Sequence, residues 1–111
     1  MKHGEVWLVD FAPKIGQEID KHRPAIIVNH DSMGVLQLKV VVPVTDAFRS
    51  LHEWHVLINP TLENGISKPS IVDCFQVKSI SKARFKKQLG KLSPRDIESV
   101  KLCLIKVLDL L

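Results

Sequence analysis

The sequence predicts a mainly β protein, a small barrel of the SH3 type, with one helix at its C-terminal end. Two observations carry this prediction. The first two thirds of the 111 residues hold short runs rich in Val, Ile, Trp and Phe, and turn residues separate the runs. The last segment instead has apolar residues at helical spacing behind a Ser-Pro pair. Five or so short strands and one helix indicate a small barrel.

Five segments have the composition of strands. The third begins by alternating polar and apolar residues, as a half-buried strand does, and the fourth places Trp54, Val56 and Ile58 on one face. Pro24 stands just before the second, where its missing N–H does least harm. The predicted strands are residues 5–11, 25–29, 36–44, 53–59 and 70–77, the last of which is the final clear strand.

The predicted helix begins at Ser93, which has the chemistry of an N-cap, and Pro94 fits its first turn. Apolar residues then follow at helical spacing, and Cys103 and Leu108 widen the apolar side. The periodic residues are Ile97, Val100, Leu104, Val107 and Leu111. We therefore expect the helix to cover the barrel, a partner chain, or both.

Composition indicates one ordinary globular domain spanning residues 1–111, with 45% hydrophobic and 25% charged residues. No apolar run approaches the roughly 20 residues that cross a bilayer, and the start of the sequence does not read as a signal peptide. Cys74 and Cys103 belong to no paired-cysteine motif and have apolar neighbours. We expect them to be buried free thiols in a protein of the reducing cytoplasm.

The charge distribution favours an acidic partner. The formal net charge is +4, and no acid occurs between Asp73 and Asp96. Seven cations fall in that interval, namely Lys78, Lys82, Arg84, Lys86, Lys87, Lys91 and Arg95. A basic segment is often only a solvated face, but this one points to a phosphate backbone or an acidic peptide.

Several common kinds of site are not expected. The segment His52-Glu-Trp-His55 is one residue too short for a zinc protease motif, and on a strand it would send its two imidazoles to opposite faces. The glycines stand alone, so no phosphate-binding loop is predicted. We expect neither a metal nor another cofactor.

The loop before the second strand carries the functional signal. The segment GEVWLVDFAPKIGQEIDKHRPAIIV combines Val-Asp-Phe-x-Pro, Gly-x-Glu and an Arg-Pro pair before an apolar strand. Together with VVPVT at 41–45, QVKSI at 76–80 and the Ser-Pro-led helix, it resembles the MazF/Kid toxins, also called PemK-like, of bacterial toxin–antitoxin pairs. The similarity covers nearly the whole chain and is weakest over residues 46–69.

The resemblance implies an SH3-like barrel that forms a homodimer. It also implies a metal-independent endoribonuclease that cuts single-stranded RNA at a short sequence, is silenced by an acidic antitoxin, and binds DNA together with it. The catalytic arginine and threonine of the family fall on Arg23 and Thr45, and its loop glutamate on Glu18. The remaining residues expected to contact RNA are Gln17, His22, Gln76, Lys78, Lys82 and Arg84.

The chemistry of these side chains agrees with such a reaction. Attack by the 2′-hydroxyl on phosphorus builds negative charge that the Arg23 fork and the Thr45 hydroxyl can stabilise. Glu18 could accept the 2′-proton if desolvation raises its pKa toward neutrality, and His22 is a further candidate for proton transfer. The sequence does not decide which group is the acid and which is the base.

Other interpretations stay open at this point. Arg23 could be a surface residue paired with Glu18 or Asp20, and Thr45 a plain strand end. The same barrel also serves non-catalytic binding modules and toxins that poison DNA gyrase. Ile19 and Phe75 depart from the family pattern and are expected to flank the RNA groove, where Phe75 could stack on a base.

Overall fold

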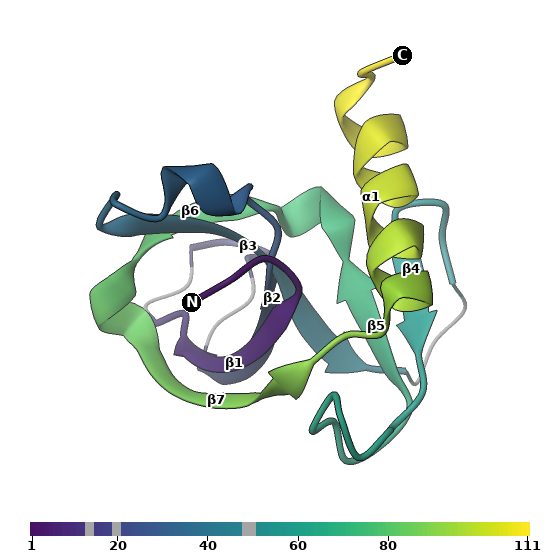
Figure 1. The fold of residues 1–111 in the computed structure, drawn as a ribbon. Coiled ribbons are helices and arrows are strands. Elements are labelled where there is room, and N and C mark those ends of the chain that lie inside the picture. Colours follow the sequence, from purple (N-terminus) through teal and green to yellow (C-terminus); the bar gives the residue numbers. More distant parts are fainter. Residues whose placement is uncertain (13–14, 19–20, 48–50) are drawn as a thin grey trace.

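The structure, a computed structural model, describes residues 1–12, 15–18, 21–47 and 51–111. In these residues an antiparallel sheet of seven strands is followed by one long helix (Figure 1). The strands are β1 (Glu5–Asp10), β2 (His22–Ile27), β3 (Leu38–Asp46), β4 (His55–Ile58), β5 (Ser70–Asp73), β6 (Lys78–Ser81) and β7 (Phe85–Lys91). Three 3₁₀ turns, η1 (Asp31–Met33), η2 (Cys74–Gln76) and η3 (Lys82–Arg84), and the helix α1 (Pro94–Leu108) complete the fold.

The predicted β fold with a C-terminal helix is confirmed, but its strand list was wrong in two places. The predicted strand at 70–77 stops at Asp73 and turns into η2. Two further strands, β6 and β7, lie in the basic segment that the sequence did not mark as β structure. β7 is an edge strand whose lysines face solvent, so its pairing with β1 stabilises it without an apolar pattern of its own.

Strand β2 begins at His22, three residues before the predicted start, because Pro24 is tolerated inside it. The β1–β2 ladder runs through Pro24, which is opposite Leu8. The β2–β3 ladder on the other side starts only at Ala25, opposite Pro43. Pro24 therefore lies where β2 has a neighbour on one side only, and its missing N–H breaks no hydrogen bond there.

Strand β3 belongs to two sheets. Residues 38–41 pair with β6, and residues 41–43 pair with β2. Residues 44–46 leave β2 and pair with β5, which also pairs with β4. The bend in β3 therefore joins the barrel around β1, β2, β6 and β7 to the smaller sheet of β4 and β5 (Figure 1).

Two apolar cores lie on the two faces of the central strands. Ile26, Val42 and Val44 face the first core, which α1 closes with Val100 and Cys103. Residues one position away in the sequence, such as Ile27 and Val41, face a second core with Phe11 and Ile80 inside the barrel. Because side chains alternate along a strand, the parity of a residue decides which core it faces.

The helix begins as predicted, since the Ser93 hydroxyl accepts a hydrogen bond from the Asp96 N–H at 3.1 Å. It ends earlier than predicted, because Asp109 has a φ of 55° and leaves Leu111 outside the helix. The two cysteines are buried and free, as expected. Burial raises the pKa of the Cys74 thiol well above its usual range, and the neighbouring Cys103 adds to this effect. No helix among the described residues is long and apolar enough to span a membrane.

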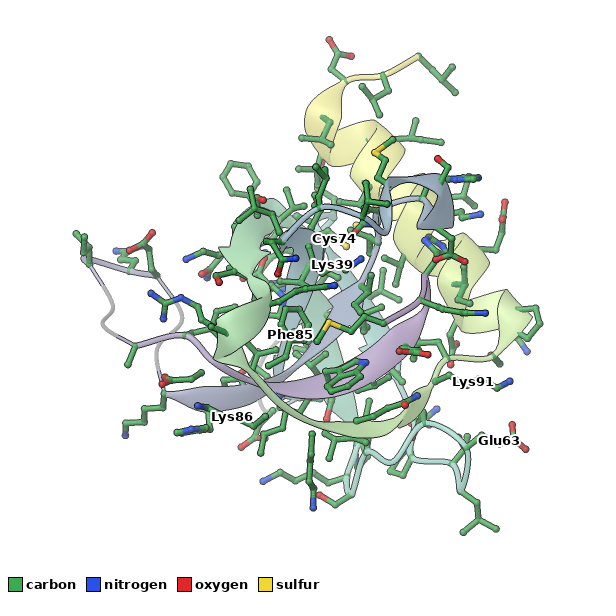
Figure 2. The ribbon with its side chains drawn as sticks, turned by 60° about the vertical axis from the view of Figure 1, so that its left-hand side comes forward. Lys39, Glu63, Cys74, Phe85, Lys86 and Lys91 are labelled. Atoms are coloured by element: carbon green, nitrogen blue, oxygen red, sulfur yellow. The ribbon has the colours of Figure 1, made fainter. Side chains whose placement is uncertain are left out.

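The turn Glu63-Asn-Gly65 packs directly against the end of β7. The Lys91 N–H donates to the Glu63 carbonyl at 2.8 Å, and Figure 2 shows both residues on neighbouring segments. A Cβ atom on Gly90 would lie 2.1 Å from the Glu63 carbonyl oxygen, so only glycine permits this approach. These contacts hold the Glu63–Gly65 turn against the end of β7.

Gly90→Ala should therefore destabilise the fold by about 3 kcal/mol, because the new methyl group would displace backbone atoms and not a flexible side chain. Urea unfolding followed by circular dichroism measures this free energy. Gly16→Ala is the matched control: Gly16 has a φ of 61° but nothing within 4 Å of a Cβ, so its cost should stay near ~1 kcal/mol. Equal costs at the two positions would contradict the steric argument.

Candidate active site

A pocket of about 640 Å³ opens between the β1–β2 loop and the chain around η2. One wall is aromatic and apolar, and the others carry amide, carboxylate and ammonium groups. The lining residues are Gln17, Glu18, Trp54, Asp73, Phe75, Gln76, Val77 and Lys78. Four of them, Gln17, Glu18, Gln76 and Lys78, were predicted from the sequence as site residues.

The aromatic wall consists of Trp54 and Phe75. Their ring centroids lie 6.3 Å apart at an interplanar angle of 66°, and the Phe75 side chain is 69% exposed. Phe75 is thus not a core residue, because η2 turns it outward where a continuing strand would have alternated it. The expectation that Phe75 flanks a groove agrees with this position, whereas Trp54 was not predicted as part of a site.

Asp73 organises the polar side of the pocket. One carboxylate oxygen accepts the Phe75 N–H at 3.1 Å, and the other accepts the Gln76 side-chain amide at 3.1 Å. Asp73 is therefore the N-cap of η2 and also orients Gln76. Sequence reasoning missed Asp73, because the predicted strand ran on to residue 77 and so did not show the turn that Asp73 caps.

The expected separation of His52 and His55 on opposite faces was wrong. Their ring centroids lie 5.3 Å apart, and the His52 N–H donates to His55 Nδ1 at 3.2 Å. The reason is that β4 starts only at His55, so His52 lies in a turn and the alternation of a strand does not apply. His52 also stacks on Trp54, with ring centroids 4.5 Å apart, although it does not itself line the pocket.

Burial is the main cause that lowers the pKa of His55; the charge of Asp73 acts in the opposite direction by less, and His52 adds to the lowering. His55 is therefore neutral near pH 7. Across the described residues, no group of three or more His, Cys, Asp or Glu side chains is arranged to hold a metal ion.

The β1–β2 loop supplies the outer rim of the pocket. Glu18 accepts the Ile15 N–H at 2.9 Å, which closes a short turn, and both Gln17 and Glu18 are exposed. Ile19 and Asp20 lie outside the described residues, so the predicted position of Ile19 beside the groove stays a prediction. Desolvation of Glu18 would have to come from a bound molecule.

Arg23 and Thr45 lie on the same face of the sheet, although neither lines the pocket. The β2–β3 ladder ends where Ala25 pairs with Pro43; because side chains alternate, Arg23 shares its face of β2 with Ala25, and Thr45 shares its face of β3 with Pro43. Thr45 pairs with Ile71, which shares its face of β5 with Asp73. Lys78, paired with Val41, also belongs to this side. The catalytic candidates therefore face the same side of the sheet as the polar end of the pocket.

The guanidinium of Arg23 is partly buried and, within the described part of the chain, incompletely hydrogen-bonded. Its Nε is buried and finds no hydrogen-bond partner among the described residues. The ion pairs found in the described part of the chain, Met1–Glu5 and Lys68–Asp46, do not include it. The alternative pairing of Arg23 with Glu18 is not seen, and Asp20 is not described.

The other predicted RNA contacts are less closely grouped. His22 precedes Arg23 in β2, so the two side chains point to opposite faces. Arg84 donates through Nη1 to the carbonyls of Asp10 and Ala12, at 3.1 and 2.5 Å, and so supports the start of the β1–β2 loop. Lys82 lies four residues beyond Lys78, about 13 Å along an extended chain.

Comparison with known proteins gives the family. The sequence profile of the PemK-like, MazF-like toxins of type II toxin–antitoxin systems matches residues 2–108. Endoribonuclease MazF9 of Mycobacterium tuberculosis (strain ATCC 25618 / H37Rv) is 28% identical over 116 residues, which cover 99% of this chain and 98% of that protein. Endoribonuclease PemK of Escherichia coli is 35% identical over 96 residues, which cover 83% and 70% of the two chains.

Solved structures agree on the fold. MazF (Form-I) from Deinococcus radiodurans superposes with a TM-score of 0.84 at 23% identity, covering 98% of this chain and 96% of that one. An endoribonuclease from Mycobacterial species in complex with its cognate antitoxin gives 0.81 at 18% identity, with 100% and 97% covered. The chain therefore belongs to the PemK-like, MazF-like toxins of type II toxin–antitoxin systems and is an endoribonuclease of that family.

Proposed function

We propose that this toxin cuts single-stranded RNA without a metal ion, by attack of a 2′-hydroxyl on the adjacent phosphorus. The observation that carries the proposal is the placement of Arg23 and Thr45 on one face of the sheet, with no described acid paired to the guanidinium. The transition state carries extra negative charge on the phosphoryl oxygens, and a guanidinium and a hydroxyl can both donate hydrogen bonds to those oxygens.

The proposed reaction forms a bond from the 2′-oxygen to phosphorus and breaks the bond from phosphorus to the 5′-oxygen. The proton leaves the 2′-hydroxyl for a base, and the 5′-oxygen takes up a proton as it departs. Glu18 is our candidate for the base, once the RNA covers its exposed carboxylate. His22 is the weaker candidate, because its side chain points to the other face of β2. Products then carry a 2′,3′-cyclic phosphate and a 5′-hydroxyl.

A pure binding module or a gyrase poison, the competing functions for this barrel, would leave RNA intact. Incubation of the purified toxin with a long RNA in the presence of EDTA should therefore give cleavage, because no step needs a metal. A single 2′-deoxy nucleotide on the 5′ side of the cut phosphate should block cutting while the RNA still binds, since it removes only the nucleophile. Efficient cleavage of that substrate would rule out the mechanism.

Arg23→Ala should lower the single-turnover cleavage rate by about 100- to 1000-fold, the usual loss when one preorganised donor is removed. Arg23→Lys keeps the charge but loses the planar pair of donors, so it should recover only part of that rate. Thr45→Val, similar in shape, should also slow cleavage. RNA affinity should change far less than rate, because the remaining cations supply most of the ground-state attraction.

The matched control for this series is Lys68→Ala, which removes an exposed cation paired with Asp46, the residue next to Thr45. It should leave the rate nearly unchanged. Circular dichroism confirms that each variant is folded. If Arg23→Ala cuts within a few-fold of the parent protein, Arg23 is a structural residue and the catalytic group lies elsewhere.

We further propose a homodimer and an acidic antitoxin as partner, acting in the cytoplasm, to which the free thiols are suited. Solved relatives include complexes with an antitoxin, as for MazE–MazF of Deinococcus radiodurans. On this chain, α1 exposes Leu102 at 57% and Leu108 at 48%. The exposed lysines of β7, including Lys86 and Lys91 in Figure 2, offer a cationic surface to an acidic tail. DNA would be bound only together with the antitoxin.

Sedimentation at micromolar concentration should show a dimer that Leu102→Lys weakens, because this variant places a charge on the exposed side of α1. Leu62→Lys is the control, since Leu62 is fully exposed on the turn that holds Glu63. Addition of the acidic protein encoded by the neighbouring reading frame should abolish cleavage. A monomer at this concentration, or an acidic neighbour that does not neutralise the toxin, would count against these partners.

A further inference from the structure

We infer that the pocket beside η2 holds one base of the RNA, and that Asp73 selects a base carrying an exocyclic amino group against uracil. This inference rests on the proposed function and names what its pocket recognises. It assigns Asp73 as a specificity-determining residue, separate from the residues that act on the phosphate.

The charges of the described lining residues disfavour a phosphate as the occupant of the pocket. Among these residues two carboxylates, Glu18 and Asp73, line the pocket, against one cation, Lys78. That ammonium is also engaged with an aromatic face, because its Nζ lies 5.9 Å from the centroid of the Phe11 ring. An anionic group would meet net repulsion here, whereas an uncharged ring with N–H donors would not.

The shape and surface of the pocket suit such a ring. Trp54 and the exposed Phe75 present π-faces on one side, and stacking of a base on an aromatic side chain is tolerant of sequence. The discrimination between bases must therefore come from the polar side. Single-stranded RNA is read in this way, with the base splayed out and its hydrogen-bonding edge turned to polar groups.

Asp73 keeps acceptor capacity for that edge. Each of its carboxylate oxygens accepts one described hydrogen bond, from Phe75 N–H and from the Gln76 amide. A carboxylate oxygen has two lone pairs, so each can accept one more. His55, its cross-strand partner, does not neutralise the charge, because burial keeps that imidazole uncharged near pH 7.

The bases differ in what they offer to two acceptors. Guanine presents an N–H and an amino group side by side, and cytosine and adenine each present an amino group. Uracil presents one N–H between two carbonyl oxygens, whose lone pairs oppose a carboxylate. The pocket should therefore prefer guanine most and uracil least, with cytosine and adenine between them.

The test starts with the unmodified toxin and a randomised RNA pool, with the cut sites mapped by sequencing. At one position of the recognition sequence, kcat/KM for an amino-bearing base should exceed that for uracil by about 10-fold or more. Replacing guanine at that position by inosine, which lacks the amino group, should lower kcat/KM. If no position disfavours uracil, the inference is wrong, whatever any variant does.

Asp73→Asn then assigns the preference to this residue. Asparagine keeps an oxygen that can cap η2 but replaces the second acceptor by an NH₂ donor, so the ratio at that one position should collapse toward unity or invert in favour of uracil. Glu53→Gln is the matched control, since it removes one negative charge from an exposed residue outside the pocket lining and should leave the ratio unchanged.

The possible results distinguish a failure of the inference about Asp73 from a failure of the proposed function. Cutting with an unchanged base preference in Asp73→Asn overturns the inference and leaves the proposed function standing. Absence of cutting of any RNA by the unmodified toxin overturns both. An effect on rate alone, equal for all bases, would show that Asp73 acts only as the cap of η2.

Discussion

Strand β3 has more pairing partners than any other strand, and the site depends on this sharing. Its first residues are held by β6 and β2, and its last three by β5. The departure from β2 after Pro43 leaves the start of β2 unpaired on that side, which is where Arg23 lies. The same departure brings Asp73 of β5 to one side of the sheet with Thr45, whereas Lys78 reaches that side through the earlier part of β3, where it pairs with Val41. A β3 that stayed in one sheet would separate the phosphate-binding candidates from the pocket.

The sequence revealed what depends on local pattern and missed what depends on pairing with distant strands. The helix start was predictable because Ser93 caps it with an atom three residues away in the chain. β7 was not predictable, because lysines and a glycine dominate it and its partner β1 lies some eighty residues earlier. The early start of β2 also depends on pairing with other strands. Pro24 is tolerated in β2 because β2 pairs there with β1 but not with β3. Contacts of this kind carry no periodic signal within the segment itself.

The residues of the site also differ in whether the sequence could reveal them. Arg23, Thr45, Glu18 and Gln76 were identified by resemblance to a family, because single polar residues have no pattern of their own. Asp73 and Trp54 were not predicted as site residues, because their roles depend on η2, which turns Phe75 outward and places it against Trp54. Arg84 was assigned to RNA with the other cations, but its guanidinium donates to backbone carbonyls at the start of the loop that carries Gln17 and Glu18. A count of cations cannot distinguish a residue that positions a loop from one that meets a phosphate.

Basic and acidic side chains lie in different parts of this protein. The basic ones can attract RNA of any sequence, and the acidic ones can distinguish one base from another. The chain has a formal net charge of +4, and exposed lysines of β7 contribute to its basic surface. Such a surface draws any RNA and falls in strength with salt, so it adds affinity without sequence preference. The described residues of the pocket lining have the opposite balance, with Glu18 and Asp73 against Lys78. A carboxylate beside the cleavage site weakens binding to every phosphate. Glu18 has the proposed role of base to offset that cost, whereas Asp73 has no proposed role in the reaction and is useful there if it distinguishes one base from another. The acidity of the pocket is therefore the strongest reason to look for sequence specificity there and not along the basic strand.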